Sequence, residues 1–87
     1  MPWAGKIDFV IPRNRGEIDL IECKWDPSHF DPAAAKLFRS YYPAGNNYLI
    51  NPQSLQPYYR EYSGLKMLVC DPEGWLRNSV PARPKPD

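Results

Sequence analysis

Hydrophobic and polar residues alternate near the start of the chain in a way that predicts a β-hairpin. Residues 6–11 place an apolar side chain at every second position, which is typical of a strand with one buried face. The proline, asparagine and glycine of residues 12–16 favour a turn. Residues 17–25 form a second apolar run, which ends at an aspartate followed by a proline. We therefore expect two antiparallel strands joined by a short connection.

The middle of the chain predicts one helix followed by short strands. Asp31 and Pro32 are the residue types preferred at the N-cap and at the first position of a helix, and the alanine-rich run after them extends to about Tyr41. Residues 47–51 contain a short apolar run that predicts a strand buried on both faces. Residues 65–70 predict a further short strand.

These elements occur in the order β-β-α-β-β, which predicts an α+β fold. We expect a small mixed or antiparallel sheet with one main helix on one face. The tyrosine-rich residues 52–63 are expected to form a connection, and Asp71 and Pro72 to end the last strand. Residues 1–76 would form a single domain, and the proline-rich residues 77–87 a flexible tail.

The composition fits one small folded domain. The chain has 87 residues, of which 43% are hydrophobic and 14% aromatic, which argues against disorder. Eleven prolines make an all-helical fold unfavourable. The net charge of +1 indicates neither a nucleic-acid partner nor an acidic one. No run approaches the roughly 18 apolar residues of a membrane span, so the expected location is cytoplasmic.

Four further residues limit the kinds of site that the chain can form. Cys23 and Cys70 each lie within an apolar run, so we expect two buried free thiols in a reducing compartment rather than a disulfide. His29 follows the aspartate–proline pair that ends the second strand, so it is expected in a loop. One histidine with two separate cysteines does not form a zinc site. Asp19 is expected to be solvated or paired within the hairpin.

Three charged residues on the predicted hairpin carry the candidate chemistry. Glu22 and Lys24 lie two positions apart and so project from the same face of a strand, and Asp8 can lie across from them on the partner strand. A charge among apolar strand residues costs several kcal/mol unless it is paired or bound to a metal. Two carboxylates that converge with a lysine suit Mg²⁺ or Mn²⁺. The alternative is an exposed hairpin face with a lysine–carboxylate pair worth under about 1 kcal/mol.

This constellation resembles the PD-(D/E)XK nuclease superfamily. The matching residues are Asp8 within the Ile-Asp-Phe-Val run and the Glu22-Cys23-Lys24 tripeptide on the next strand, and a helix and a strand follow as in that family. The resemblance covers residues 6–51 and implies a restriction-endonuclease-like core. It also implies that Asp8 and Glu22 ligate the metal, and that Lys24 orients or activates water and offsets negative charge during phosphodiester hydrolysis.

The chain is also similar to the C-terminal nuclease-like domain of bacterial and archaeal AAA-type ATPases. Segments similar to residues 42–48 and 64–67 follow the helix in that family. The superfamily core begins with a helix and a strand, whereas only residues 1–5 precede the first strand here, so the core is expected to be truncated. The open sheet would then favour a homodimer. No nucleotide-binding Gly-x-x-x-x-Gly-Lys-Ser/Thr motif is present, so an ATPase encoded elsewhere is a candidate partner.

Basic and aromatic residues outside the triad are candidate contacts to nucleic acid. Arg13 and Arg15 in the predicted turn could meet a phosphate backbone, and Lys36 and Arg39 form a short basic strip on the predicted helix. The tyrosine-rich residues 58–62 could stack on unpaired bases. Solvated surface is the alternative for the basic residues, and coverage of a sheet edge is the alternative for the tyrosines.

Two functions from different classes follow from these observations. The first is a Mg²⁺-dependent nuclease-like domain that hydrolyses phosphodiester bonds of nucleic acid. The alternative is a catalytically inactive interaction or dimerisation module of the same fold, in which the three charged residues form a structural cluster. Divalent-metal binding that depends on Asp8 and Glu22 distinguishes the two.

Overall fold

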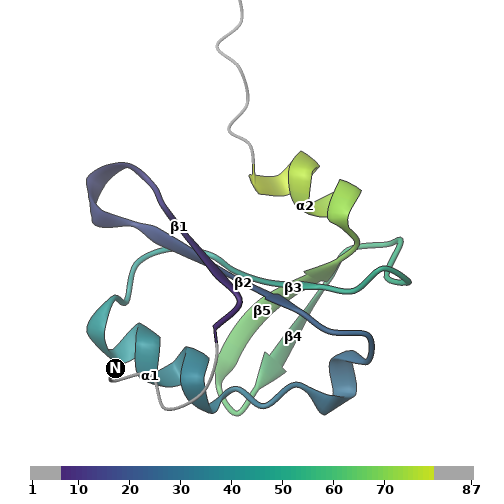
Figure 1. Cartoon of the computed structure of the whole chain (residues 1–87), viewed down its shortest axis with the longest axis horizontal. Helices are drawn as coiled ribbons and strands as arrows, with labels where there is room; N and C mark the ends of the chain where they lie inside the picture. Colours follow the sequence, from purple (N-terminus) through teal and green to yellow (C-terminus); the bar gives the residue numbers. More distant parts are fainter. Residues whose placement is uncertain (1–6, 80–87) are drawn as a thin grey trace, which may run out of the picture.

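The computed structural model describes residues 7–79, which form a mixed sheet with two helices (Figure 1). Its strands lie in the order β1-β2-β3-β5-β4. The elements are β1 (Phe9–Pro12), η1 (Asn14–Gly16), β2 (Ile18–Cys23), η2 (Pro27–His29), α1 (Ala33–Tyr41), β3 (Asn47–Ile50), β4 (Tyr58–Tyr62), β5 (Leu65–Cys70) and α2 (Pro72–Ser79), where η marks a short 3₁₀ helix. The α+β class predicted from the sequence is confirmed.

Parallel pairing in the centre of the sheet is flanked by an antiparallel strand at each edge. β2, β3 and β5 run parallel to one another, while β1 pairs antiparallel with β2 and β4 antiparallel with β5. Parallel strands need a crossover connection, and α1 supplies it between β2 and β3. The strand order leaves β1 and β4 as the two edges of the sheet.

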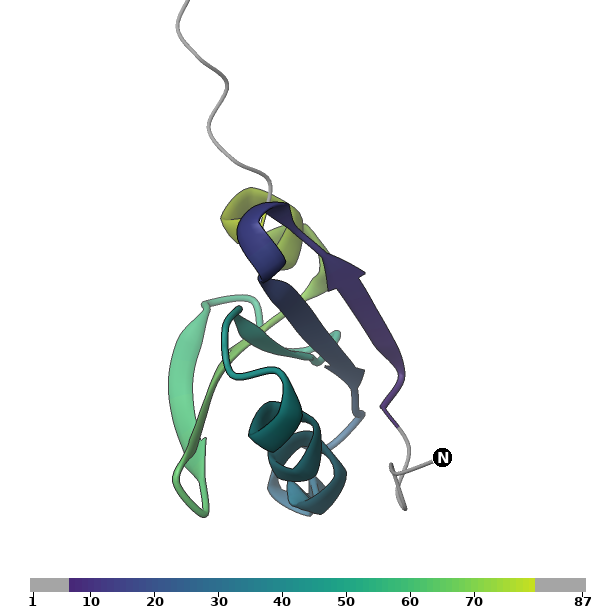
Figure 2. The same cartoon turned by 90° about the vertical axis from the view of Figure 1, so that its left-hand side faces the viewer.

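The two faces of the sheet are covered unequally. Figures 1 and 2 show α1 and α2 on opposite sides of the strands. The face beneath α1 holds the main core, which includes the fully buried residues Leu20, Leu49, Met67 and Val69 together with Phe38 of the helix. The opposite face holds a smaller cluster, and α2 adds only Trp75 to it. The buried members of this cluster are Ile21, Tyr48, Ile50, Leu68 and Cys70.

Aspartate–proline pairs begin every helical element that follows the hairpin in residues 7–79. The carboxylates of Asp26, Asp31 and Asp71 each accept a hydrogen bond of 2.8–3.0 Å from a backbone N–H two or three positions later. Such a carboxylate satisfies a helical N–H that has no partner within the helix, and the proline fits the first turn because it lacks an N–H.

Two predictions about the second half of the chain were wrong. Residues 52–63 are not only a connection, because they include β4. Asp71 and Pro72 end β5 as predicted but also begin α2, so the structure has two helices rather than one main helix. α2 continues to Ser79, so residues 77–79 are helical, and the remainder of the predicted tail, 80–87, lies outside the described residues. No helix between residues 7 and 79 is long and apolar enough to cross a membrane.

Candidate functional site

The three predicted site residues meet at one end of the β1–β2 hairpin. The register pairs Phe9 with Ile21, which places Asp8 opposite Glu22. The backbone N–H of Asp8 donates to Glu22 Oε1 at 3.4 Å, and the backbone N–H of Cys23 donates to Asp8 Oδ2 at 2.8 Å. The two carboxylates therefore lie next to each other, as the hairpin pattern predicted.

Glu22 is the unusual member of this group because its side chain is buried. The residue is only 3% exposed. Burial, and after it the negative charge of Asp8, raises the pKa of Glu22 to about 7, while the Lys24 ammonium acts in the opposite direction. A buried carboxylate at this pKa holds a proton readily because the site lacks sufficient positive charge. A cation bound between Asp8 and Glu22 would supply that charge.

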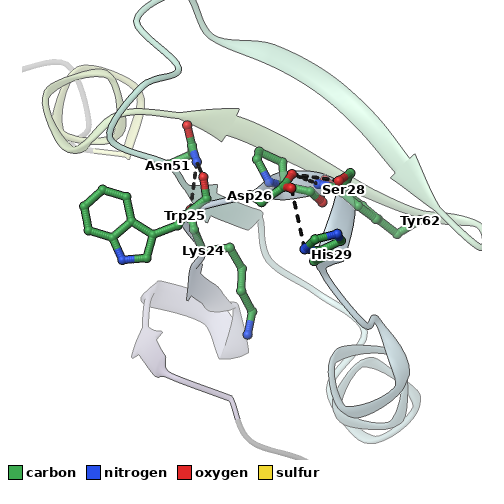
Figure 3. Close-up of polar contacts among 8 residues, drawn as sticks. Lys24, Trp25, Asp26, Ser28, His29, Asn51 and Tyr62 are labelled. Atoms are coloured by element: carbon green, nitrogen blue, oxygen red, sulfur yellow. Dashed lines mark hydrogen bonds and ion pairs between the residues drawn. The ribbon is translucent and has the colours of Figure 1, made fainter.

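Lys24 is held through its backbone. Its N–H donates to the carbonyl of Ile50 at 2.9 Å, and its own carbonyl accepts from Asn51 Nδ2 at 2.8 Å. Figure 3 shows the Lys24 side chain extending away from Asn51. The ammonium takes part in no ion pair within residues 7–79, so it can contact a bound anion.

Asn51 is a site residue that the sequence analysis missed. It is as buried as Glu22, and its amide also donates to the carbonyl of Trp25 (Figure 3). Its side-chain oxygen accepts from the N–H of Gln53 and the hydroxyl of Ser54, both at 3.0 Å. Asn51 thus joins the end of β2 to the loop after β3. An asparagine before a proline at a strand end is typical of a turn, and this signal could have indicated it.

A small pocket of about 200 Å³ opens beside Glu22 and Lys24. The start of α1 and the preceding turn form its other walls, with His29 and Asp31 as the polar residues there. His29 lies in an exposed 3₁₀ turn and pairs with Asp26 at 3.5 Å. The pocket therefore offers a partly polar space directly next to the buried carboxyl group.

The donor set fits a hard divalent cation. Mg²⁺ binds through one or two carboxylates and keeps several water molecules or substrate oxygens as its other ligands. Asp8 and Glu22 provide two such carboxylates in contact. No cluster of three or more histidine, cysteine, aspartate or glutamate residues is arranged to hold a metal in residues 7–79. The remaining ligands of a cation at this pair would therefore be water or substrate oxygens.

The predicted basic residues lie outside this pocket. Arg13 and Arg15 are at the hairpin tip, at the other end of β2, where Arg13 Nε pairs with Asp19 Oδ2 at 3.0 Å. Because Asp19 pairs with Arg13, the predicted pairing within the hairpin is confirmed, while the alternative of a solvated Asp19 is wrong because the residue is buried. Lys36 Nζ donates to the carbonyl of Ser63 at 2.8 Å.

Arg39 has a structural role. Its guanidinium donates to Asn47 Oδ1 at 2.7 Å and to the carbonyls of Tyr42, Ala44 and Asn46 at 2.9–3.0 Å. These bonds fix the loop between α1 and β3. The side chain is therefore engaged within the protein and does not join the pocket at Glu22.

Both cysteines are free thiols, as expected, but only Cys70 is buried. The prediction that Cys23 is buried was wrong. Cys23 is at the end of β2 with its side chain on the face opposite Glu22, where α2 does not cover the sheet completely.

Comparison with known proteins found no matching family model, no similar curated protein and no similar solved structure. The function is therefore inferred from the geometry and chemistry of the site.

Proposed function

We propose that this chain is a divalent-metal-dependent nuclease-like domain that hydrolyses phosphodiester bonds of nucleic acid. The observation that carries the proposal is the contact between Asp8 and the buried Glu22, with Lys24 beside them. Asp8 and Glu22 would hold Mg²⁺ or Mn²⁺. When bound, the cation would polarise a phosphoryl oxygen and lower the pKa of its water. The resemblance of these residues to the PD-(D/E)XK superfamily supports the same assignment.

Each protein group has a defined task in this proposal. Asp8 is already oriented by the backbone N–H of Cys23. Glu22 releases its proton near neutral pH, because its pKa of about 7 falls when a cation approaches. The Lys24 ammonium offsets the negative charge that develops on the phosphoryl oxygens. Asn51 fixes the backbone from which Lys24 projects.

Candidate contacts to the substrate backbone lie farther from the triad. Arg13 and Arg15 at the hairpin tip and Lys36 on α1 remain proposed phosphate contacts. Arg39 supports the loop after α1 instead. We also propose a cytoplasmic location, since free thiols persist in reducing compartments. An ATPase encoded elsewhere remains a candidate partner.

Calorimetric titration with Mn²⁺ tests the proposal. The native chain should bind the cation, while Asp8→Asn and Glu22→Gln should lose binding and Glu61→Gln, which removes an exposed carboxylate on β4, should retain it. Cleavage of single- and double-stranded DNA and of RNA is then assayed in Mg²⁺. A folded native chain that binds neither cation would contradict the metal-dependent reaction.

Exposed apolar residues favour a second candidate function, a homodimerisation module. Phe9 is 60% exposed on the edge strand β1, and Trp25 is 78% exposed just after β2. An apolar groove of about 420 Å³ lies between Phe9 and α2 and is lined in part by Ile21 and Trp75, while Trp25 lines a separate apolar hollow. A second copy that pairs along β1 would cover these side chains. Sedimentation of native chain and Phe9→Lys tests this, because only the native chain should dimerise.

A further inference from the structure

The sheet face opposite α1 contains a polar hollow of about 410 Å³ near the β4 edge. Tyr48 of β3 and Tyr59 of β4 are both register partners of Leu68 on β5, so these three side chains form a row across the sheet. Lys66 of β5 and Asn78 of α2 also line the hollow. Glu22 projects to the other face, so this hollow is separate from the proposed metal centre.

Tyr48 of β3 is one of the polar residues that line the hollow. The residue is 3% exposed. Burial, followed by the charge of Asp19, raises the pKa of Tyr48, and Arg13 and Tyr59 are also close enough to act on it. The raised pKa keeps the Tyr48 phenol neutral, so its hydroxyl can act as a hydrogen-bond donor.

Lys66 and Tyr59 provide a cation and a stacking surface in the same place. Lys66 Nζ lies 4.4 Å from the centroid of the Tyr59 ring. The residue Tyr59 is 65% exposed, so its ring can also accept a planar group by stacking. Glu61 is the cross-strand partner of Lys66 but forms no ion pair with it. The Lys66 charge is thus available to an anion.

A second hollow of about 520 Å³ adjoins the first, because Asn46 lines both. Its walls include Arg13 and Arg15 of the hairpin tip, with Glu17 as the exposed acidic residue there. Arg13 is oriented by Asp19 through Nε alone, so its terminal Nη groups have no partner among the described residues. The side-chain amide of Asn46 is likewise unpaired within residues 7–79.

We infer that these joined hollows bind a nucleoside phosphate, with its base stacked on Tyr59 and its phosphate near Lys66 and Arg13. Asn46 and the Tyr48 hydroxyl would bond the polar edges of the base or sugar. A volume of a few hundred Å³ suits one such unit. The unit is either a free mononucleotide or one residue of a single strand. Because the hollows are on the other face of the sheet, nucleotide binding there does not depend on whether Asp8 and Glu22 support hydrolysis.

Titration of the native chain with adenosine monophosphate, uridine monophosphate, inorganic phosphate and a short oligo-deoxythymidine tests this inference, with NMR shifts of the Asn46 and Asn78 side-chain amides as the readout. Tyr59→Leu should weaken nucleotide binding at least about fivefold, since it removes the stacking surface. Lys66→Gln should weaken it by a similar factor, and Tyr48→Phe should weaken it less.

Arg77→Gln is the matched control, because it removes an exposed positive charge on α2 that does not line either hollow. Binding of the oligomer but not the mononucleotides would identify a strand as the ligand, and binding of both would identify the single unit. Equal affinity for inorganic phosphate and the nucleotides would show that the base does not stack on Tyr59. The inference is wrong if millimolar nucleotide shifts no resonance, or if folded Tyr59→Leu and Lys66→Gln both bind like the native chain.

Discussion

The buried Glu22 carboxyl should make the protein less stable as pH rises, and Glu22→Gln should remove this dependence. The folded chain holds this proton up to a pKa of about 7, whereas an unfolded chain releases it near the ordinary value of 4.5. Between these values the folded state binds more protons than the unfolded state, so the free energy of unfolding decreases as pH rises. The contribution is fully present below about 4.5 and is lost as pH passes 7.

The difference between the two pKa values sets the magnitude. Each pKa unit corresponds to about 1.4 kcal/mol, so the native chain should lose about 3 kcal/mol of stability across this range. In a domain of this size each kcal/mol moves the melting temperature by about 4–8 °C. Asp8→Asn should keep most of the effect, because burial raises the pKa of Glu22 more than the Asp8 charge does.

Thermal unfolding followed by circular dichroism, in EDTA and across this pH range, measures the effect. Native and variant chains are compared in a His29→Gln background, which removes the one histidine of the sequence. Glu61→Gln serves as the exposed carboxylate control. If Glu22→Gln retained the pH dependence of the native chain, the burial of Glu22 would not be the cause and the reasoning would fail.

Three further predictions follow from the same contacts. Mn²⁺ affinity should rise about tenfold per pH unit below pH 7, because binding displaces the Glu22 proton; a flat calorimetric profile would exclude this coupling. Asn51→Leu should lower the free energy of unfolding in urea by about 2 kcal/mol, because the partly buried carbonyls of Lys24 and Trp25 lose their donor. The exposed substitution Asn14→Leu should change it far less. Asp71→Ala should cost about 1 kcal/mol through loss of the α2 cap, and a cost no larger than that of an exposed Glu17→Ala would contradict that role.

Local signals in the sequence predicted the elements that have strong periodicity or caps. β5 was predicted with the bounds that the structure has, and α1 begins after Asp31 and Pro32 as expected. The same pair of residue types at Asp71 begins α2, so this helix could also have been predicted. Gly74 inside its short span weakened that signal.

β4 was harder to predict because its side chains are mostly exposed and show no apolar alternation. Its pairing with β5 depends on the turn at Ser63 and Gly64, where φ is 53° and 89°. Two positive φ values are typical of a tight hairpin turn, and the serine–glycine pair was the available signal. Edge strands of this kind are defined by the strand they pair with rather than by their own sequence.

The candidate site likewise has features that the sequence predicted and features that it could not predict. Hairpin register and the two-residue period of a strand were enough to predict that Asp8, Glu22 and Lys24 converge. The burial of Glu22 could not be predicted, since it depends on α1 and the turn before it covering the end of β2. The hydrogen bond from the Asn51 amide to the carbonyl of Lys24 likewise could not be predicted, because it joins segments that are distant in the sequence.

The position of Asp8 links the two proposed functions and gives them a common test. Asp8 immediately precedes the edge strand β1, so a dimer that pairs along β1 would bring two Asp8–Glu22 sites toward each other. Phe9 projects to the opposite face from Asp8, so Phe9→Lys should separate the copies without touching the carboxylates. Mn²⁺ binding by this monomeric variant at native affinity would mean that one chain holds a complete site. Loss of binding together with loss of the dimer would mean that the second copy contributes a ligand, and loss of binding in a variant that still dimerises would contradict both arrangements.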